Sequence, residues 1–94
     1  MSTWQTQDFC IPTGHPTAAG HFPGQPIIPG ALLLDAVVAA IGQTSIIVRN
    51  VKFLLPTPHG TPLQLRWQGG PKYVFECRNK NDALVMTGTL AATP

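Results

Sequence analysis

Apolar and polar positions alternate most regularly in the second half of the chain. Over residues 63–68 every second residue is apolar, beginning with Leu63, and over residues 72–78 the apolar positions include Tyr73 and Phe75. A period of two is typical of a strand with one buried face. The sequence therefore predicts strands over these two ranges, joined by a turn at residues 69–71. A turn at residues 79–82 precedes a last predicted strand over residues 83–91.

The first half of the chain predicts strands of a less regular kind. Residues 4–11 alternate weakly and are interpreted as a first strand, followed by a turn at residues 12–14 and a short helical turn at residues 15–20. Residues 44–55 are rich in β-branched side chains and are predicted to form one long strand with Val51, Phe53 and Leu55 on one face. Residues 56–62 are expected to form a turn-rich connection.

Between these strands, residues 31–41 are apolar on nearly every helical face. Pro29 and Gly30 favour a helix start here, and Gly42 is suited to the position after its end. A helix that is apolar all round is normally buried, so we expect other parts of the protein to wrap it. The predicted fold is α+β, a single domain over residues 1–94, in which an antiparallel sheet ending in a four-stranded meander curls around one central helix.

Composition adds an expectation about assembly. Charged residues make up 11% of the chain and hydrophobic residues 44%, whereas about a quarter of a typical soluble domain is charged. So little charge favours an oligomer, in which another chain covers part of the surface. A net charge of +2 without a basic run argues against nucleic acid as a partner.

The sequence also predicts the cellular location. No apolar stretch approaches the roughly 20 residues that a membrane-spanning helix needs, and the N-terminus has no signal-peptide pattern, so we expect a cytoplasmic protein that does not cross a membrane. Cys10 and Cys77 are interpreted as two buried or half-buried thiols and not as a disulfide.

Candidate chemistry lies in residues 21–35. His21 opens a loop that three prolines stiffen, and Asp35 is the only formally charged residue between Asp8 and Arg49. A lone acid in an apolar helix is costly to bury, and such acids often mark functional sites. His21 alone would more often be a structural or surface histidine, and Asp35 alone could be neutralised by a buried partner.

A metal site is the weakest of the interpretations. His15, Cys10 and His59 are the residues that such a site would use. Their spacing fits no zinc pattern, so no metal is expected.

The combination of these residues resembles a known family. Residues 20–30 read GHFPGQPIIPG, Asp35 follows His21 by fourteen residues, and residues 51–60 read VKFLLPTPHG. This pattern is similar to the active-site loop, helical acid and following strand of the β-hydroxyacyl-acyl-carrier-protein dehydratases of the FabA/FabZ type, which have the hot-dog fold. With residues 15–20 included, the likeness is greatest to the short members found with aryl-polyene biosynthesis.

The resemblance implies a reaction and its residues. Such enzymes remove water from a 3-hydroxyacyl thioester to give a trans-2-enoyl thioester in fatty-acid or polyene synthesis. His21 would be the base and Asp35 the acid or the group that orients the departing water. The N–H of Gly30 would bind the thioester oxygen at the positive end of the helix dipole. The resemblance also implies a substrate pocket formed by Phe22, Pro29 and Leu34.

Partners follow from the same resemblance. An acyl carrier protein would deliver the substrate on its 4′-phosphopantetheine arm, and no other cofactor is implied. Family members form dimers, with themselves or with a related hot-dog subunit, and each site takes its histidine from one chain and its acid from the other. All six Lys and Arg residues are interpreted as a solvated face, and some of them would meet an acidic carrier; they are Arg49, Lys52, Arg66, Lys72, Arg78 and Lys80.

Three positions depart from parts of the family. The helical acid is Asp35 as in FabA-type enzymes, but Ala31 stands where the isomerising members carry cysteine, so no isomerase activity is expected. Ala39 stands where a glutamine usually positions the acid. Ala39 leaves open a non-catalytic partner subunit of a heterodimeric dehydratase. A hot-dog acyl thioesterase stays open as well, because the fold that the resemblance implies also hydrolyses thioesters with a lone carboxylate.

Overall fold

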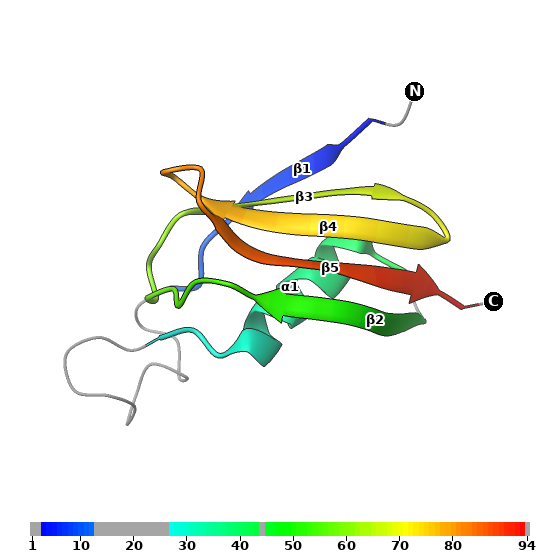
Figure 1. Cartoon of the computed structure of the whole chain (residues 1–94), viewed down its shortest axis with the longest axis horizontal. Coiled ribbons are helices and arrows are strands. Elements are labelled where there is room, and N and C mark those ends of the chain that lie inside the picture. The colour runs from blue at the N-terminus through cyan, green and yellow to red at the C-terminus, as the bar shows by residue number, and fades with distance from the viewer. Residues whose placement is uncertain (1–2, 13–26, 44, 94) are drawn as a thin grey trace.

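One five-stranded antiparallel sheet packs against one helix, as the α+β prediction required (Figure 1). The computed structural model describes residues 3–12, 27–43 and 45–93. The short helical turn predicted at residues 15–20 and most of the proline-rich loop lie outside these ranges. The elements are β1 (Gln5–Phe9), α1 (Gly30–Ile41), β2 (Ile46–Phe53), β3 (Leu63–Gly69), β4 (Lys72–Asn79) and β5 (Leu84–Ala92).

The strand order corrects one prediction. The order is β1-β3-β4-β5-β2, so β3, β4 and β5 form a meander, whereas β2 pairs with β5 at the far edge and not with β3. The four-stranded meander is therefore wrong. The connection over residues 54–62 carries the chain from one edge of the sheet towards the other. It is held by the Leu54 N–H, which donates to the Val85 carbonyl at 2.8 Å, and by the Gly60 N–H, which donates to the Ile11 carbonyl at 2.7 Å.

The core lies between the central strands and the helix. The apolar positions predicted to be buried on β3 and β4 are all buried, and Phe75 at their centre has no exposed surface. Each large side chain buried in this way contributes about 1.5–3 kcal/mol. The alternation in the sequence thus identified the inner face of these strands correctly, namely Leu63, Leu65, Trp67, Tyr73, Phe75 and Cys77.

The edge strand β2 is less buried than predicted. Val51 and Phe53 are paired with consecutive inner-face positions of β5, but Val51 is only half-buried and Phe53 is 54% exposed. Leu55, expected on the same face, lies beyond the end of the strand and is exposed. The reason is that, among the residues that the structure describes, β2 has a neighbouring strand on one side only.

Helix α1 has the predicted ends but not the predicted environment. Gly30 is its first residue, one position earlier than expected, and Gly42 caps its C-terminus in the left-handed conformation. Leu33 and Val37 are its buried residues and lie on the side packed on the sheet. One sheet covers only one side of a helix, so the expectation of a helix wrapped all round is wrong for a single chain. The opposite side exposes three residues that follow each other at one-turn intervals, Ala31, Asp35 and Ala39.

Both cysteines are free thiols, as predicted. Cys77 is buried, but Cys10 is exposed, which differs from the expectation, because it follows the edge strand β1. Among the described residues, no helix is both long enough and apolar enough to cross a membrane.

Candidate active site

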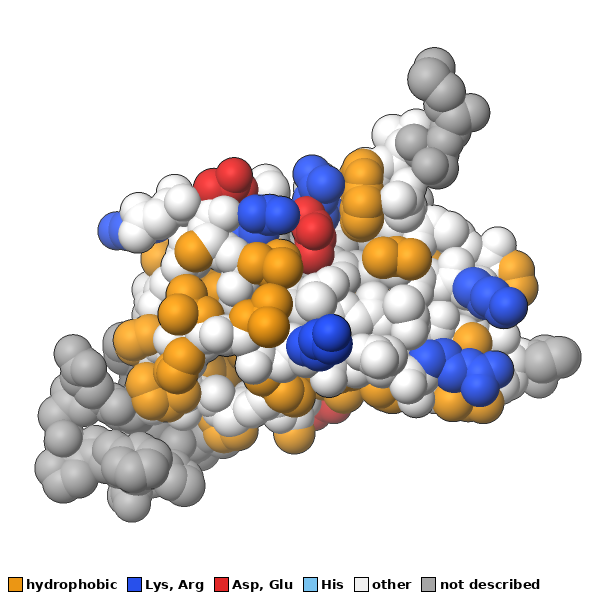
Figure 2. Space-filling model, viewed as in Figure 1, with side chains coloured by type: hydrophobic (Ala, Val, Ile, Leu, Met, Phe, Trp, Pro, Cys, Tyr) orange, Lys and Arg blue, Asp and Glu red, His pale blue; other side chains and the backbone are white. Residues whose placement is uncertain are grey.

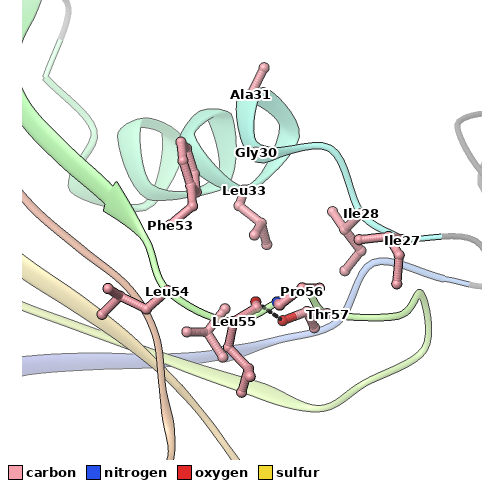
Figure 3. A pocket seen from close by; sticks show the side chains of 11 residues that line it. Ile27, Ile28, Gly30, Ala31, Leu33, Phe53, Leu54, Leu55, Pro56 and Thr57 are labelled. Atoms are coloured by element: carbon pink, nitrogen blue, oxygen red, sulfur yellow. Dashed lines mark hydrogen bonds between the residues drawn. The ribbon is translucent and has the colours of Figure 1, made fainter.

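A cavity of about 560 Å³ opens beside the N-terminus of α1 (Figure 3). Its polar side chain is that of Thr57, whose hydroxyl donates to the Leu55 carbonyl at 3.1 Å and so has its proton already engaged. A cavity with this lining is suited to an apolar group, since none of the described lining residues has a charged side chain to pair with a charged one. The lining residues are Ile27, Ile28, Gly30, Ala31, Leu33, Phe53, Leu54, Leu55, Pro56, Thr57 and Val85.

Two segments far apart in the sequence are tied together to form this cavity. The Ile28 N–H donates to the Thr57 carbonyl at 2.9 Å, and Ile27 forms an isolated bridge with Pro58. Backbone hydrogen bonds of this kind fix the segment before the helix against the connection that follows β2. The entrance to α1 and the opposite wall of the cavity are therefore held at a defined separation.

The start of α1 leaves backbone donors free of side-chain caps. Pro29 occupies the position before the helix with φ −59° and ψ 140°, and it makes no side-chain hydrogen bond to the helix. Proline has no side-chain oxygen with which to cap the first amides. The N–H groups of the first turn carry the positive end of the helix dipole, so this end of the cavity is suited to a developing negative charge.

Gly30 is closely packed against the Phe53 ring. A Cβ placed on Gly30 would lie 2.8 Å from Cζ of Phe53 and 2.9 Å from Cε1 of the same ring. Real Cβ atoms essentially never approach other heavy atoms so closely. A side chain at position 30 would therefore displace the Phe53 ring from where it stands.

Asp35 lies on the exposed side of α1 and is not among the residues that line the cavity. Within the described part of the chain it forms no ion pair. The described residues of one chain therefore do not supply the water-excluded setting that an acid needs to hold its proton at neutral pH. A second chain covering this side of the helix would be needed.

The other predicted site residues are placed as follows. Gly30 lines the cavity. Pro29 directly precedes Gly30 in the chain and is exposed, and Leu34 is half-buried on α1 and does not line the cavity. His21 and Phe22 lie outside the described residues, so their roles stay predictions.

Several lining residues were missed from the sequence. Phe53 was predicted only to share a strand face with Val51 and Leu55, and Val85 comes from β5, far along the chain from the helix. The local signal for Phe53 was available, because it stands directly before the turn-rich segment. No local signal connects Val85 with Gly30.

The charged residues are partly paired on the outer face of the sheet, away from the helix. Arg66 lies 2.7 Å and Arg78 3.1 Å from the same carboxylate oxygen of Glu76, and the Arg66 guanidinium lies over the Trp4 ring at 4.3 Å. These two arginines are therefore not the freely solvated cations that we expected. Figure 2 shows Lys and Arg side chains spread along this face, with apolar side chains gathered toward the end where β2 finishes. In the described ranges, no three His, Cys, Asp or Glu side chains come together as a metal site would require.

Comparisons with known proteins agree with this architecture. The chain is 29% identical over 98 residues to the 3-hydroxyacyl-[acyl-carrier-protein] dehydratase FabZ of Zymomonas mobilis, an alignment that covers 88% of this chain and 62% of the relative. It is also 50% identical over 32 residues to FabZ of Haemophilus influenzae, which covers 34% of this chain and 22% of the relative. The chain thus spans less than two thirds of the length of these relatives.

Solved structures show the same fold. A structure of the dehydratase heterocomplex ApeI:P from Xenorhabdus doucetiae superimposes with a TM-score of 0.77 at 23% identity, covering 94% of this chain and 85% of that one. An uncharacterised protein from Erwinia carotovora subsp. atroseptica gives a TM-score of 0.82 at 25% identity, covering 99% and 85%. The fluoroacetyl-CoA-specific thioesterase FlK is similar at a TM-score of 0.60 and 13% identity, covering 96% and 84%. These likenesses confirm the predicted hot-dog fold.

A family model extends the agreement to nearly the whole sequence. The model of the ApeI-like proteins, described as ApeI dehydratase, matches residues 2–89. This range contains the cavity, the helix and all but the last residues of the sheet. The chain therefore belongs to the ApeI-like dehydratase family.

Proposed function

We propose that this protein acts as a 3-hydroxyacyl-[acyl-carrier-protein] dehydratase, removing water from a carrier-bound thioester to leave a trans-2-enoyl product. The observation that carries the proposal is the apolar cavity at the uncapped start of α1, in a chain that matches the ApeI-like family over residues 2–89. A 4′-phosphopantetheine arm would bring the acyl group to this cavity. The FabZ relatives bear the name of the same reaction, which supports this choice of substrate.

Three groups of the protein take part in the elimination of water. The His21 imidazole removes a proton from C2, the C2–C3 double bond forms, and the C3 hydroxyl leaves as water after taking a proton from Asp35. While the C2 proton leaves, negative charge grows on the thioester oxygen. The Gly30 N–H faces that oxygen and stabilises the charge, aided by the helix dipole.

The site is completed by a second chain in this proposal. Asp35 is exposed on α1, and the sheet has two edges at which a chain could add, β1 and β2. Polar residues dominate β1, whereas exposed apolar side chains gather on β2 and just after it, at Ile47, Val48, Phe53, Leu54 and Leu55. An edge strand with this apolar character is a natural surface for strand pairing. Pairing at β2 would set a second helix beside α1 and exclude water from Asp35.

The charges on β2 favour a related hot-dog subunit over an identical copy. Arg49 and Lys52 lie on this strand without an acidic residue, so two copies paired edge to edge would bring like charges together. The similar structure of ApeI:P is that of a dehydratase heterocomplex, which supports the same preference.

Ala39, in the place of the usual glutamine, leaves open a second candidate function, a non-catalytic subunit that completes the site of its partner. With two free thiols, the complex is assigned to the cytoplasm.

Activity is tested with a 3-hydroxyacyl thioester on a carrier protein, using the chain alone and mixed with a related hot-dog subunit. We expect an enoyl product, detected by mass spectrometry as loss of water, and a fall of about 10²-fold or more in rate for His21→Ala. A mixed complex in which His21→Ala stays fully active would identify the non-catalytic subunit. Release of the free carrier thiol without an enoyl product would identify a thioesterase, and no turnover in any mixture would refute the proposal.

Association is tested separately by light scattering after size exclusion. Ile47→Asp places a charge on the proposed interface and should leave the chain unable to pair with the related hot-dog subunit or with a second copy of itself. Val74→Asp is the matched control, because Val74 is equally exposed but lies on the interior strand β4. If Ile47→Asp pairs as well as the Val74→Asp control, β2 is not the interface.

A further inference from the structure

Phe53 is an aromatic residue in an unusual position. It is the last residue of β2, it is 54% exposed, and it lines the cavity beside α1. Its ring stands between the strand and the helix (Figure 3). A large apolar ring left half-exposed at the wall of a cavity has more surface to bury. A bound apolar ligand would cover the part that faces the cavity, beside any surface that a chain paired at β2 covers.

The ring meets the helix at the point where the reaction is proposed to occur. The atoms at its tip, Cζ and both Cε atoms, come within 2.8–3.1 Å of the place that a Cβ on Gly30 would occupy. The ring therefore fills the space next to the Gly30 backbone. The remaining walls, including Ile28 and Thr57, lie across the cavity from it (Figure 3).

We propose that Phe53 is a specificity residue that admits acyl thioesters unbranched at C2 and rejects those branched there. The proposal rests on the function proposed above, in which the thioester oxygen faces the Gly30 N–H. In this proposal C2, which is bonded to the carbonyl carbon, lies against the Phe53 ring, because the ring fills the space beside Gly30. A methyl group on C2 would compete with the ring for the same space, while carbons further along the chain lie toward Ile28 and Thr57.

The proposal separates two properties of the substrate. Bulk near the carbonyl is limited by Phe53, whereas the length of the chain is limited by the walls opposite. A change at Phe53 should therefore alter selection between 2-methyl and unbranched substrates of equal chain length.

The test compares a 3-hydroxyacyl thioester with its 2-methyl analogue on the same carrier. We expect Phe53→Ala to raise the ratio of kcat/KM for the branched over the unbranched substrate by about tenfold or more, the size of effect that a methyl group has in a shaped apolar pocket. Phe53→Leu, which keeps an apolar side chain at the strand end, should give an intermediate ratio and guards against a variant that fails to fold. Val74→Ala removes a similarly exposed apolar side chain away from the cavity and should leave the ratio unchanged.

A second readout keeps this inference distinct from the proposed function. Unreactive amide analogues of the two substrates, which keep the carbonyl oxygen but lack the 3-hydroxyl, are titrated calorimetrically onto the same variants, in complex with the partner subunit where one is needed. If the wild type forms no enoyl product, the proposed function fails, yet a ratio of affinities that shifts in Phe53→Ala still supports Phe53 as the selecting wall. If folded Phe53→Ala and Phe53→Leu leave both the rate ratio and the affinity ratio as in the wild type, the inference is overturned.

Discussion

Gly88 on β5 allows β2 to approach the rest of the sheet, and Gly88→Ala is predicted to weaken that junction. Gly88 is paired with Val51 on one side and Phe75 on the other. A Cβ at this position would overlap the backbone carbonyl oxygen of Asn50 and lie 2.8 Å from Cζ of Phe75. The pairing of β2 shifts by one residue between Val48 and Asn50, next to this point. Glycine in a strand commonly marks such a close approach of two backbones.

The loss in the free energy of unfolding can be derived from the groups that an added Cβ would displace. Overpacking a core typically costs about 1–3 kcal/mol. The upper end applies here because one obstacle is backbone and the other is the fully buried Phe75 ring. Alanine recovers about 0.5–1 kcal/mol relative to glycine through the unfolded chain. The net loss in the free energy of unfolding is thus about 2 kcal/mol, or a fall in Tm of about 8–16 °C for a domain of this size.

Thermal and urea unfolding measure this loss, at equal protein concentrations because association raises apparent stability. Thr89→Ala is the control, since it places alanine on the same strand without adding atoms and should cost less than about 1 kcal/mol. Gly88→Ala within about 0.5 kcal/mol of the wild type would refute the close-approach argument. If Gly88→Ala costs nothing further in a Phe75→Leu background, the ring alone is the obstacle and the Asn50 carbonyl is not.

Three further results are expected. Asp35→Asn should lower kcat/KM by about 10²-fold or more. It should not lower stability, because the carboxylate is exposed and forms no ion pair among the described residues. A fall in Tm with unchanged activity would contradict this. Burial raises the pKa of the Cys77 thiol from 9.0 to about 11, so on raising the pH this thiol ionises first in the unfolded chain. The thiol should therefore leave the free energy of unfolding unaffected below pH 9.0 and lower it as the pH rises from 9.0 to about 11. Urea unfolding of wild type and Cys77→Ala over that range should show this extra fall in the wild type only. Asn79→Ala should cost about 1–2 kcal/mol in thermal unfolding, since the Asn79 Oδ1 accepts the N–H groups of Asn81 and Ala83 at 2.9 and 3.1 Å, whereas Asn79→Asp, which keeps an acceptor, should cost less.

The features that sequence reasoning predicted well are encoded locally. The buried faces of β3 and β4 follow from alternation within each strand, and the ends of α1 follow from Pro29, Gly30 and Gly42. Each signal acts over a few residues and does not depend on what the chain does elsewhere.

The misplaced features depend on distant partners. β2 has the same alternation whether it pairs with β3 or with β5, so no residue in it distinguishes the meander from the observed order. The burial of Phe53 and Asp35 likewise depends on what covers an edge strand and the outer side of a helix. Within one chain both are exposed, and apolar content alone predicted the opposite.

The position of β2 also governs the order in which the molecule can assemble during synthesis. The nascent chain contains α1 and β2 early, but the strand that β2 pairs with, β5, is made more than thirty residues later. Until the ribosome has released β5, the apolar side of α1 has no finished sheet to lie on, and one wall of the cavity, Val85, does not yet exist. Pairing between distant segments is slow to form. The cavity is therefore a late product of folding, and a chain shortened before β5 would keep its helix sequence but lose its binding site.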